Sequence, residues 1–91
     1  MTDLGLSARR FRKRPVVIEA MQLTWESAPE VLAFCDGKAG YDPTGKMDHL
    51  IIRTLEGTMR ADWDDWVICG VKGEFYPCDP DIFAATYEEL Y

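Results

Sequence analysis

The chain has 91 residues, of which 47% are hydrophobic and 29% are charged, and its formal net charge is −6. This composition excludes wholesale disorder, and a chain this short has room for one domain but not for a separate cofactor-binding half. No apolar run approaches the roughly 18 residues that a transmembrane helix needs, and the first residues lack the pattern of a secretory signal. We therefore expect one cytoplasmic domain without a membrane partner.

The charge is divided unevenly along the chain. Residues 1–14 hold five basic residues and one acidic residue, a net charge of +4, whereas residues 15–91 hold five basic and fifteen acidic residues, a net charge of −10. We expect residues 1–11 to form a basic flexible arm and residues 12–91 to form the single α+β domain. Nucleic acid is not expected as a partner except through the basic run Arg9–Arg14. That run can equally be a solvated leader or pair with carboxylates of the body.

β-Branched and apolar residues predict a first strand over residues 15–24, which begins with a proline where no ladder donor is needed. Ser27 and Glu30 then have the spacing of a capping box. Pro29 suits the first turn of a helix, where its missing N–H costs no hydrogen bond. The sequence therefore predicts a short helix over residues 28–36, which packing rather than propensity must hold.

The middle of the chain predicts an antiparallel meander. Residues 37–48 are rich in glycine, proline and aspartate, so we expect an exposed loop, with room for a short extended stretch, that is either mobile or used for binding. A hairpin follows, in which Glu56 and Gly57 form the turn between two strands. The predicted strands of this region cover residues 50–55, 58–61, 66–69 and 74–77.

Asp79 and Pro80 predict the start of a last helix, as an N-cap followed by proline at the first helical position. Apolar residues at helical spacing continue it towards Leu90. The fold class that follows is α+β. We expect a small, strongly curved antiparallel sheet of four to five strands, a meander or partial barrel, with two short helices packed on it.

The residues that carry most enzyme and metal chemistry are few and scattered. Cys35, Cys69 and Cys78 have no metal or redox spacing, and His49 is the only histidine. The acidic turn at residues 62–65 offers the oxygen ligands that hard cations prefer, but it lacks the ligand order of a calcium loop, so we interpret it as a solvated turn. We expect no metal, no cofactor and no enzymatic activity.

A few cations and aromatic residues give the acidic body a possible binding face. Arg53 and Arg60 flank the hairpin turn, and with Lys72 they would suit an anionic ligand. Trp66 and Tyr76 would supply stacking surfaces beside them. The alternative is that the two arginines pair with neighbouring carboxylates. These five residues form the candidate ligand-binding site.

Three stretches resemble a widespread family of small uncharacterised bacteriophage and prophage proteins that has a Pro-Gly-Asp-Tyr-Gly-like turn. They are residues 12–20 (RKRPVVIEA), 50–59 (LIIRTLEGTM) and 70–87 (GVKGEFYPCDPDIFAATY). The chain departs from the family where Trp63-Asp64-Asp65-Trp66 replaces Pro-Gly-Asp-Tyr, which keeps the aspartate and the aromatic residue but loses the Pro-Gly turn. The resemblance implies phage origin and work in the cytoplasm of an infected bacterium. It implies no known catalytic residue.

Three hypotheses for function follow from these observations. The first is a non-enzymatic phage accessory protein that binds a small anionic ligand, such as a nucleotide signal of host immunity, or otherwise counteracts host processes. The second is a protein-binding module that inhibits a host factor through its acidic surface, and the third is a virion-associated structural protein. Because so small a body carries many aromatic residues, we also expect a homodimer or a higher homo-oligomer.

Overall fold

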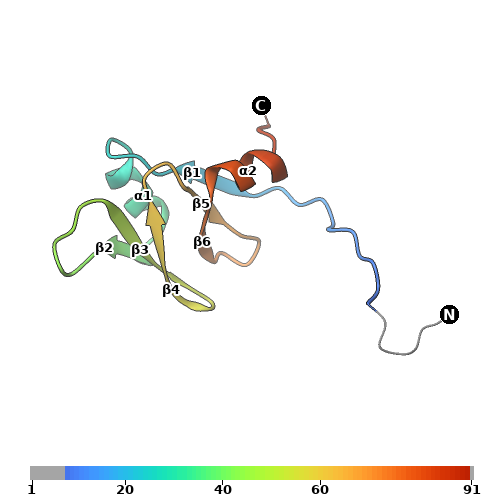
Figure 1. The fold of residues 1–91 in the computed structure, drawn as a ribbon, viewed down its shortest axis with the longest axis horizontal. Helices are drawn as coiled ribbons and strands as arrows, with labels where there is room; N and C mark the ends of the chain where they lie inside the picture. Colours follow the sequence, from blue (N-terminus) through green and yellow to red (C-terminus); the bar gives the residue numbers. More distant parts are fainter. Residues whose placement is uncertain (1–7, 91) are drawn as a thin grey trace.

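Two three-stranded antiparallel sheets and two short helices build the described part of the chain, residues 8–90 of a computed structural model (Figure 1). Sheet A has the strand order β1-β5-β6, and sheet B has the order β2-β3-β4. The elements are β1 (Glu19–Gln22), α1 (Ala28–Phe34), β2 (Ala39–Tyr41), β3 (His49–Thr54), β4 (Gly57–Asp62), β5 (Trp66–Cys69), β6 (Phe75–Cys78) and α2 (Pro80–Thr86). The α+β class is confirmed.

The hairpin of β3 and β4 confirms the strand pairing predicted for the middle of the chain, but the turn predicted at Glu56–Gly57 is wrong by one residue: Leu55 and Glu56 form it, and Gly57 is the first residue of β4. Its strands pair from His49 with Asp62 to Thr54 with Gly57. Gly57 has a φ of 106°, in the left-handed region that favours glycine. The expected loop before this hairpin contains β2, which pairs with the outer side of β3.

The expected single curved sheet of four to five strands is wrong, because six strands form two separate sheets and neither closes nor curls within residues 8–90. The change occurs in the acidic turn after β4. Asp64 has a φ of 77°, and its N–H donates to the carbonyl oxygen of Leu23 at 2.6 Å. The N–H of Leu23 in turn donates to the carbonyl oxygen of Asp65 at 2.8 Å. These bonds direct the chain to β1, so β5 pairs with β1 instead of continuing beside β4.

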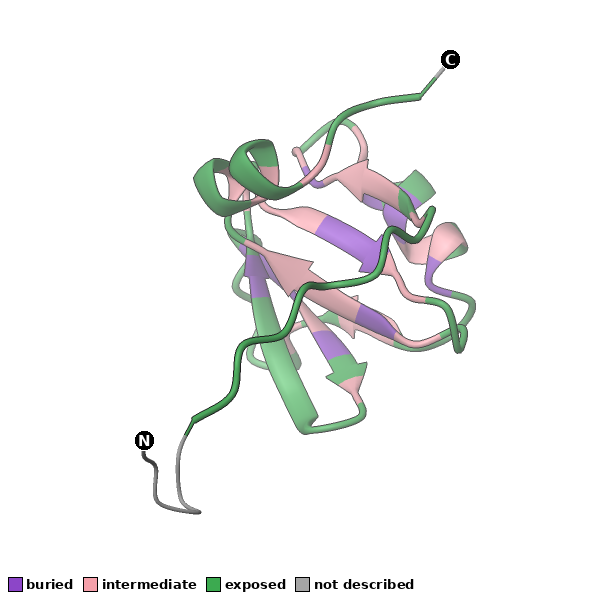
Figure 2. Ribbon diagram, turned by 90° about the vertical axis from the view of Figure 1, so that its right-hand side faces the viewer, coloured by how far each residue is buried: buried purple, intermediate pink, exposed green. Residues whose placement is uncertain are grey.

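The first strand is shorter than the predicted range 15–24. β1 covers only Glu19–Gln22, because β5 has four residues and pairs with those four alone. The chain before it is exposed from residue 8 to residue 17 (Figure 2). It passes the end of α2, where the Lys13 ammonium donates to the Tyr87 hydroxyl at 3.3 Å, and then extends away from the body (Figure 1). The basic arm is expected over residues 1–11. Residues 1–7 of it lie outside the described part of the chain.

The two helices begin differently from one another. At α1, Ser27 is the N-cap but its side chain makes no capping bond, so the predicted capping box is wrong. Its hydroxyl instead donates to the carbonyl oxygen of Gln22 at 2.7 Å and accepts the N–H of Thr24 at 2.8 Å, which ties the helix to β1. At α2, the carboxylate of Asp79 accepts the N–H groups of Asp81 and Ile82, which confirms the predicted cap.

The core lies between the two sheets and α1. Its largest fully buried side chains include Leu23, Val31, Leu50, Ile52 and Val67. Figure 2 shows buried segments within the strands, while the helix α2 is exposed or half-buried. Within residues 8–90, no helix is long and apolar enough to cross a membrane.

Candidate functional site

Arg53 and Arg60 lie on the face of sheet B that points away from the core. The Nε atom of Arg60 is 2.6 Å from a carboxylate oxygen of Asp62, and its Nη2 atom is 3.9 Å from one of Asp48. The hydrogen bond with Asp62 raises the pKa of the Arg60 guanidinium. Arg60 is therefore already paired with acids, which is the alternative that the sequence left open for this residue.

The other two candidate cations are exposed. The guanidinium of Arg53 donates to the carbonyl oxygen of Gly37, just beyond α1. Lys72 lies in the turn between β5 and β6, where its backbone N–H donates to a carboxylate oxygen of Glu74 at 2.8 Å. A carboxylate thus lies beside this lysine as well, which weakens the field that an anion would meet.

Trp66 and Tyr76 lie on sheet A, on the face where α2 packs. The indole of Trp66 stacks on the ring of Phe83 in α2, with centroids 4.3 Å apart and planes 5° apart. Burial, together with the neighbouring Tyr87, raises the pKa of Tyr76 to about 12. The structure thus brings the two candidate arginines to one face and the two candidate aromatic residues to another.

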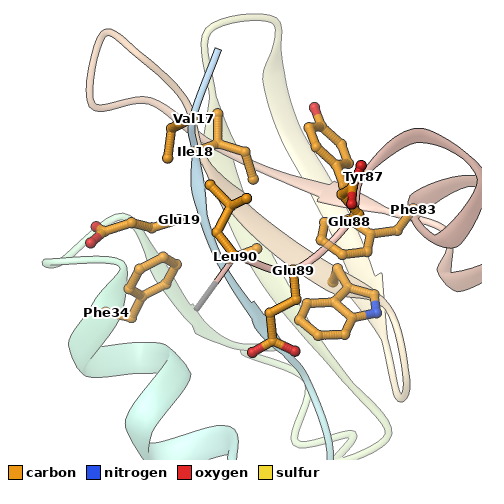
Figure 3. Close-up of a pocket in the computed structure, with 11 residues that line it drawn as sticks. Val17, Ile18, Glu19, Phe34, Phe83, Tyr87, Glu88, Glu89 and Leu90 are labelled. Carbon is orange, nitrogen blue, oxygen red and sulfur yellow. The ribbon is translucent and has the colours of Figure 1, made fainter. Parts of the chain in front are cut away.

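An open groove of about 560 Å³ runs between β1 and α2, and we call it the α2 groove (Figure 3). In Figure 3, Leu90 lies near the centre of the labelled side chains, below Val17 and Ile18 and to the left of the rings of Phe83 and Tyr87. The groove is lined by Val17, Ile18, Glu19, Ala20, Phe34, Trp66, Phe83, Tyr87, Glu88, Glu89 and Leu90.

The lining of the α2 groove combines apolar surface with negative charge. Trp66, Phe83 and Tyr87 form a continuous aromatic stack, since the Phe83 and Tyr87 centroids are 4.9 Å apart. Every ionisable side chain of the lining other than tyrosine is a glutamate. Such a groove suits an apolar group that carries a positive charge close by, and it repels a free anion.

A second polar centre surrounds His49, which the sequence did not single out as a site. The side chain is buried, although it points to the outer face of sheet B, because the loop after β2 folds over it. Its Nδ1 atom is 2.6 Å from a carboxylate oxygen of Asp48, and its Nε2 atom is 2.9 Å from one of Asp42. Each ring nitrogen thus faces a carboxylate oxygen, which can only accept a hydrogen bond.

This arrangement holds a loop and offers no catalytic base. Both nitrogens of the His49 ring are occupied by carboxylates, and a general base needs a free one. Burial raises the pKa of the Cys35 thiol to about 11, so this cysteine is a poor nucleophile at neutral pH. Among the residues that the structure describes, no three His, Cys, Asp or Glu side chains gather in a way that would hold a metal ion.

Acid is expected to destabilise the fold through the carboxylates that hold His49. Hydrogen bonds from Thr44 lower the pKa of Asp42, and the bond with His49 lowers that of Asp48, both from an ordinary value of 3.8. The stability they contribute is complete above that value and is lost as the pH falls through the lower folded-state values. Asp65, whose pKa burial raises, acts in the opposite direction.

The measurement is the denaturant midpoint at neutral pH and near pH 3, for the wild type and for Asp48→Asn. The variant keeps an acceptor for the His49 ring but cannot titrate, so it is expected to lose less stability than the wild type over this interval. If both proteins lost the same stability between neutral pH and pH 3, Asp48 would not be a source of the acid sensitivity.

Comparisons with known proteins give no indication of function, so a proposal has to be argued from the geometry of the chain. The resemblance to phage proteins stays an expectation, and so does the phage origin that it implies. No protein-family model matches the chain, and neither curated proteins nor solved structures show significant similarity to it.

Proposed function

We propose that the chain is a non-enzymatic binding protein that holds an extended segment of a partner protein in the α2 groove. The observation that carries this proposal is the joint presence of an aromatic stack and a glutamate rim in one open groove. The proposal corresponds to the second hypothesis from the sequence, a protein-binding module that uses an acidic surface. On the phage resemblance, the partner would be a host factor that the chain inhibits.

The groove specifies the chemistry of the segment that it would take. An aromatic or aliphatic side chain would lie against Phe83 and Leu90, where apolar surface is open. Lysine or arginine on either side of it would meet Glu88 and Glu89, which are exposed on the tail after α2. The net charge of −10 over residues 15–91 would attract such a segment from a distance.

A small anionic ligand has less support from the geometry. Arg60 is neutralised by two acids, and the aromatic residues that would stack on a nucleotide line a groove rimmed by glutamates. The third hypothesis, a structural protein of the virion, would be tested by mass spectrometry of purified particles. It makes no use of the groove.

The test uses a fluorescent peptide in which arginines flank a tryptophan, and a matched peptide with glutamates in their place. Fluorescence anisotropy is expected to show binding of the basic peptide only. Glu89→Lys should weaken that binding about three- to tenfold, because a rim contact reverses its sign. Glu26→Lys makes the same change of charge on an exposed residue outside the groove and should have little effect.

Two outcomes would overturn the proposal. Equal weakening by Glu89→Lys and Glu26→Lys would mean that the peptide senses only net charge. Binding of a nucleotide that is lost in Arg53→Ala, with no binding of the basic peptide, would instead establish the anionic ligand.

A further inference from the structure

The outer edge of sheet A is open along the chain before β1 and along β1 as far as Met21, whereas at Gln22 the carbonyl oxygen accepts the hydroxyl of Ser27. β1 is the terminal strand of its sheet, with β5 on its inner side. Residues 8–18 have no backbone-to-backbone hydrogen bond within the described part of the chain. Val16 and Val17 there are β-branched, and they are 46% and 75% exposed. An extended apolar edge of this kind is a template for another strand.

The backbone of β1 determines which residues face this edge. Both polar groups of Leu23 bond towards the turn before β5. Backbone groups alternate sides along a strand, so the odd-numbered residues of β1 face β5 and the even-numbered ones face outwards. If the same alternation continues into the chain before β1, the backbone N–H and C=O groups of Val16 and Ile18 point away from β5, towards the open edge. Pro15, which has no N–H, falls on the inner side, where a partner strand needs no donor from it.

We propose that this edge pairs with the same edge of a second copy of the chain, antiparallel and around a two-fold axis at Val16. In a two-fold antiparallel pair the central residue faces its own copy, and an outward, even-numbered residue there exchanges both backbone hydrogen bonds with it. A centre at the inward residue Val17 would instead leave Glu19 opposite Pro15, without a partner charge. With the centre at Val16, each residue before Val16 lies opposite the residue of the second copy that is equally far after Val16, so that the two residue numbers add up to 32. The inference concerns the edge of sheet A and does not depend on what the α2 groove binds.

Charge and hydrophobicity select Val16 as the centre. In this register Lys13 lies opposite Glu19 of the second copy, and symmetry makes this pair twice. Phe11, which is 81% exposed, lies opposite Met21, which packs against the core. A centre at Arg14 would place two arginines face to face, which is unfavourable for a cross-strand pair. A centre at Ile18 would leave Glu19 opposite an apolar residue.

The pairing also places opposite charges together over a longer range. The basic run Arg9–Arg14 of each copy, part of a segment with a net charge of +4, runs along the acidic body of the other. The two sheets A become one six-stranded sheet, in which the two β1 edges are covered. The second copy is therefore the occupant that fits both the backbone and the charges of this edge.

Two proline substitutions test the register. Val16→Pro removes an outward N–H that the second copy would bind, whereas Val17→Pro removes an inward one that neither copy uses. Neither residue is buried or part of a strand, so both variants should fold. Sedimentation of the full chain is expected to give about twice the monomer mass of 10.4 kDa for the wild type and for Val17→Pro. Val16→Pro should weaken the dimer at least about tenfold.

A cysteine at the centre provides a second measurement. Directly opposite, hydrogen-bonded residues have Cα atoms about 5.5 Å apart, within the range of a disulfide. Val16→Cys is therefore expected to form a disulfide with the same position of the second copy under mild oxidation, identified by peptide mass spectrometry, and Val17→Cys should not. A monomeric wild type, or a dimer that both prolines weaken equally, would overturn the proposal. Neither result bears on peptide binding in the α2 groove, which is measured separately with the wild type and the two glutamate variants, because Val17 itself lines that groove.

Discussion

Leu50→Ala is expected to cost about 2–5 kcal/mol of unfolding free energy, a large part of the stability of a domain this small. Leu50 is fully buried on β3, between β2 and β4, and belongs to the cluster that joins the two sheets. Its truncation removes apolar contacts and leaves a cavity that short strands on either side cannot easily close. The measurement is the denaturant midpoint, with the slope of the transition unchanged.

The control for this prediction lies in the same hairpin. Leu55→Ala makes the same chemical change at its tip, where the side chain is 72% exposed. This variant should stay within about 0.5 kcal/mol of the wild type, as surface substitutions usually do. If the two variants had similar midpoints, the core between the sheets would not be where the structure places it.

Local sequence signals predict the elements of this fold better than their assembly. The hairpin about Gly57 and the cap of α2 at Asp79 are formed by residues close in sequence, so their turn and capping chemistry is sufficient to find them. Strand pairing between β1 and β5 joins residues far apart in the chain, and the bonds of Leu23 that establish it have no sequence signal. That is why the sequence predicts one sheet where the structure has two.

For the candidate site too, the sequence indicates single residues better than how they come together in space. Trp66, which the sequence predicts as a stacking surface for a ligand beside the arginines, stacks on Phe83 of α2, away from the arginines. The pairing of Arg60 with acids is the alternative that the sequence left open. The α2 groove is not predicted, because it forms only where the tail after α2 passes the chain before β1. Apolar residues at both ends of the chain are its only signal.

His49→Leu is expected to cost about 1–3 kcal/mol, because the two carboxylates that contact its ring lose their hydrogen-bond partner. For a domain of this size, each kcal/mol corresponds to about 4–8 °C in Tm. The loop over residues 42–48 should also exchange its amide hydrogens faster, while β3 and β4 keep their protection. His49→Gln, which retains an amide donor, should fall between the wild type and the leucine variant.

His49 holds the loop over residues 42–48 more than it holds the core. The prediction for His49→Leu therefore differs from that for Leu50→Ala, which concerns the core. His49 is 2% exposed because Asp42 and Asp48 bring the loop over it, and Arg60 lies beside Asp48. Leucine fills much of the same volume but leaves both carboxylates facing an apolar side chain. If His49→Leu were as stable as the wild type, with unchanged exchange in the loop, packing alone would hold this segment and the contacts of His49 with the two carboxylates would contribute nothing to it.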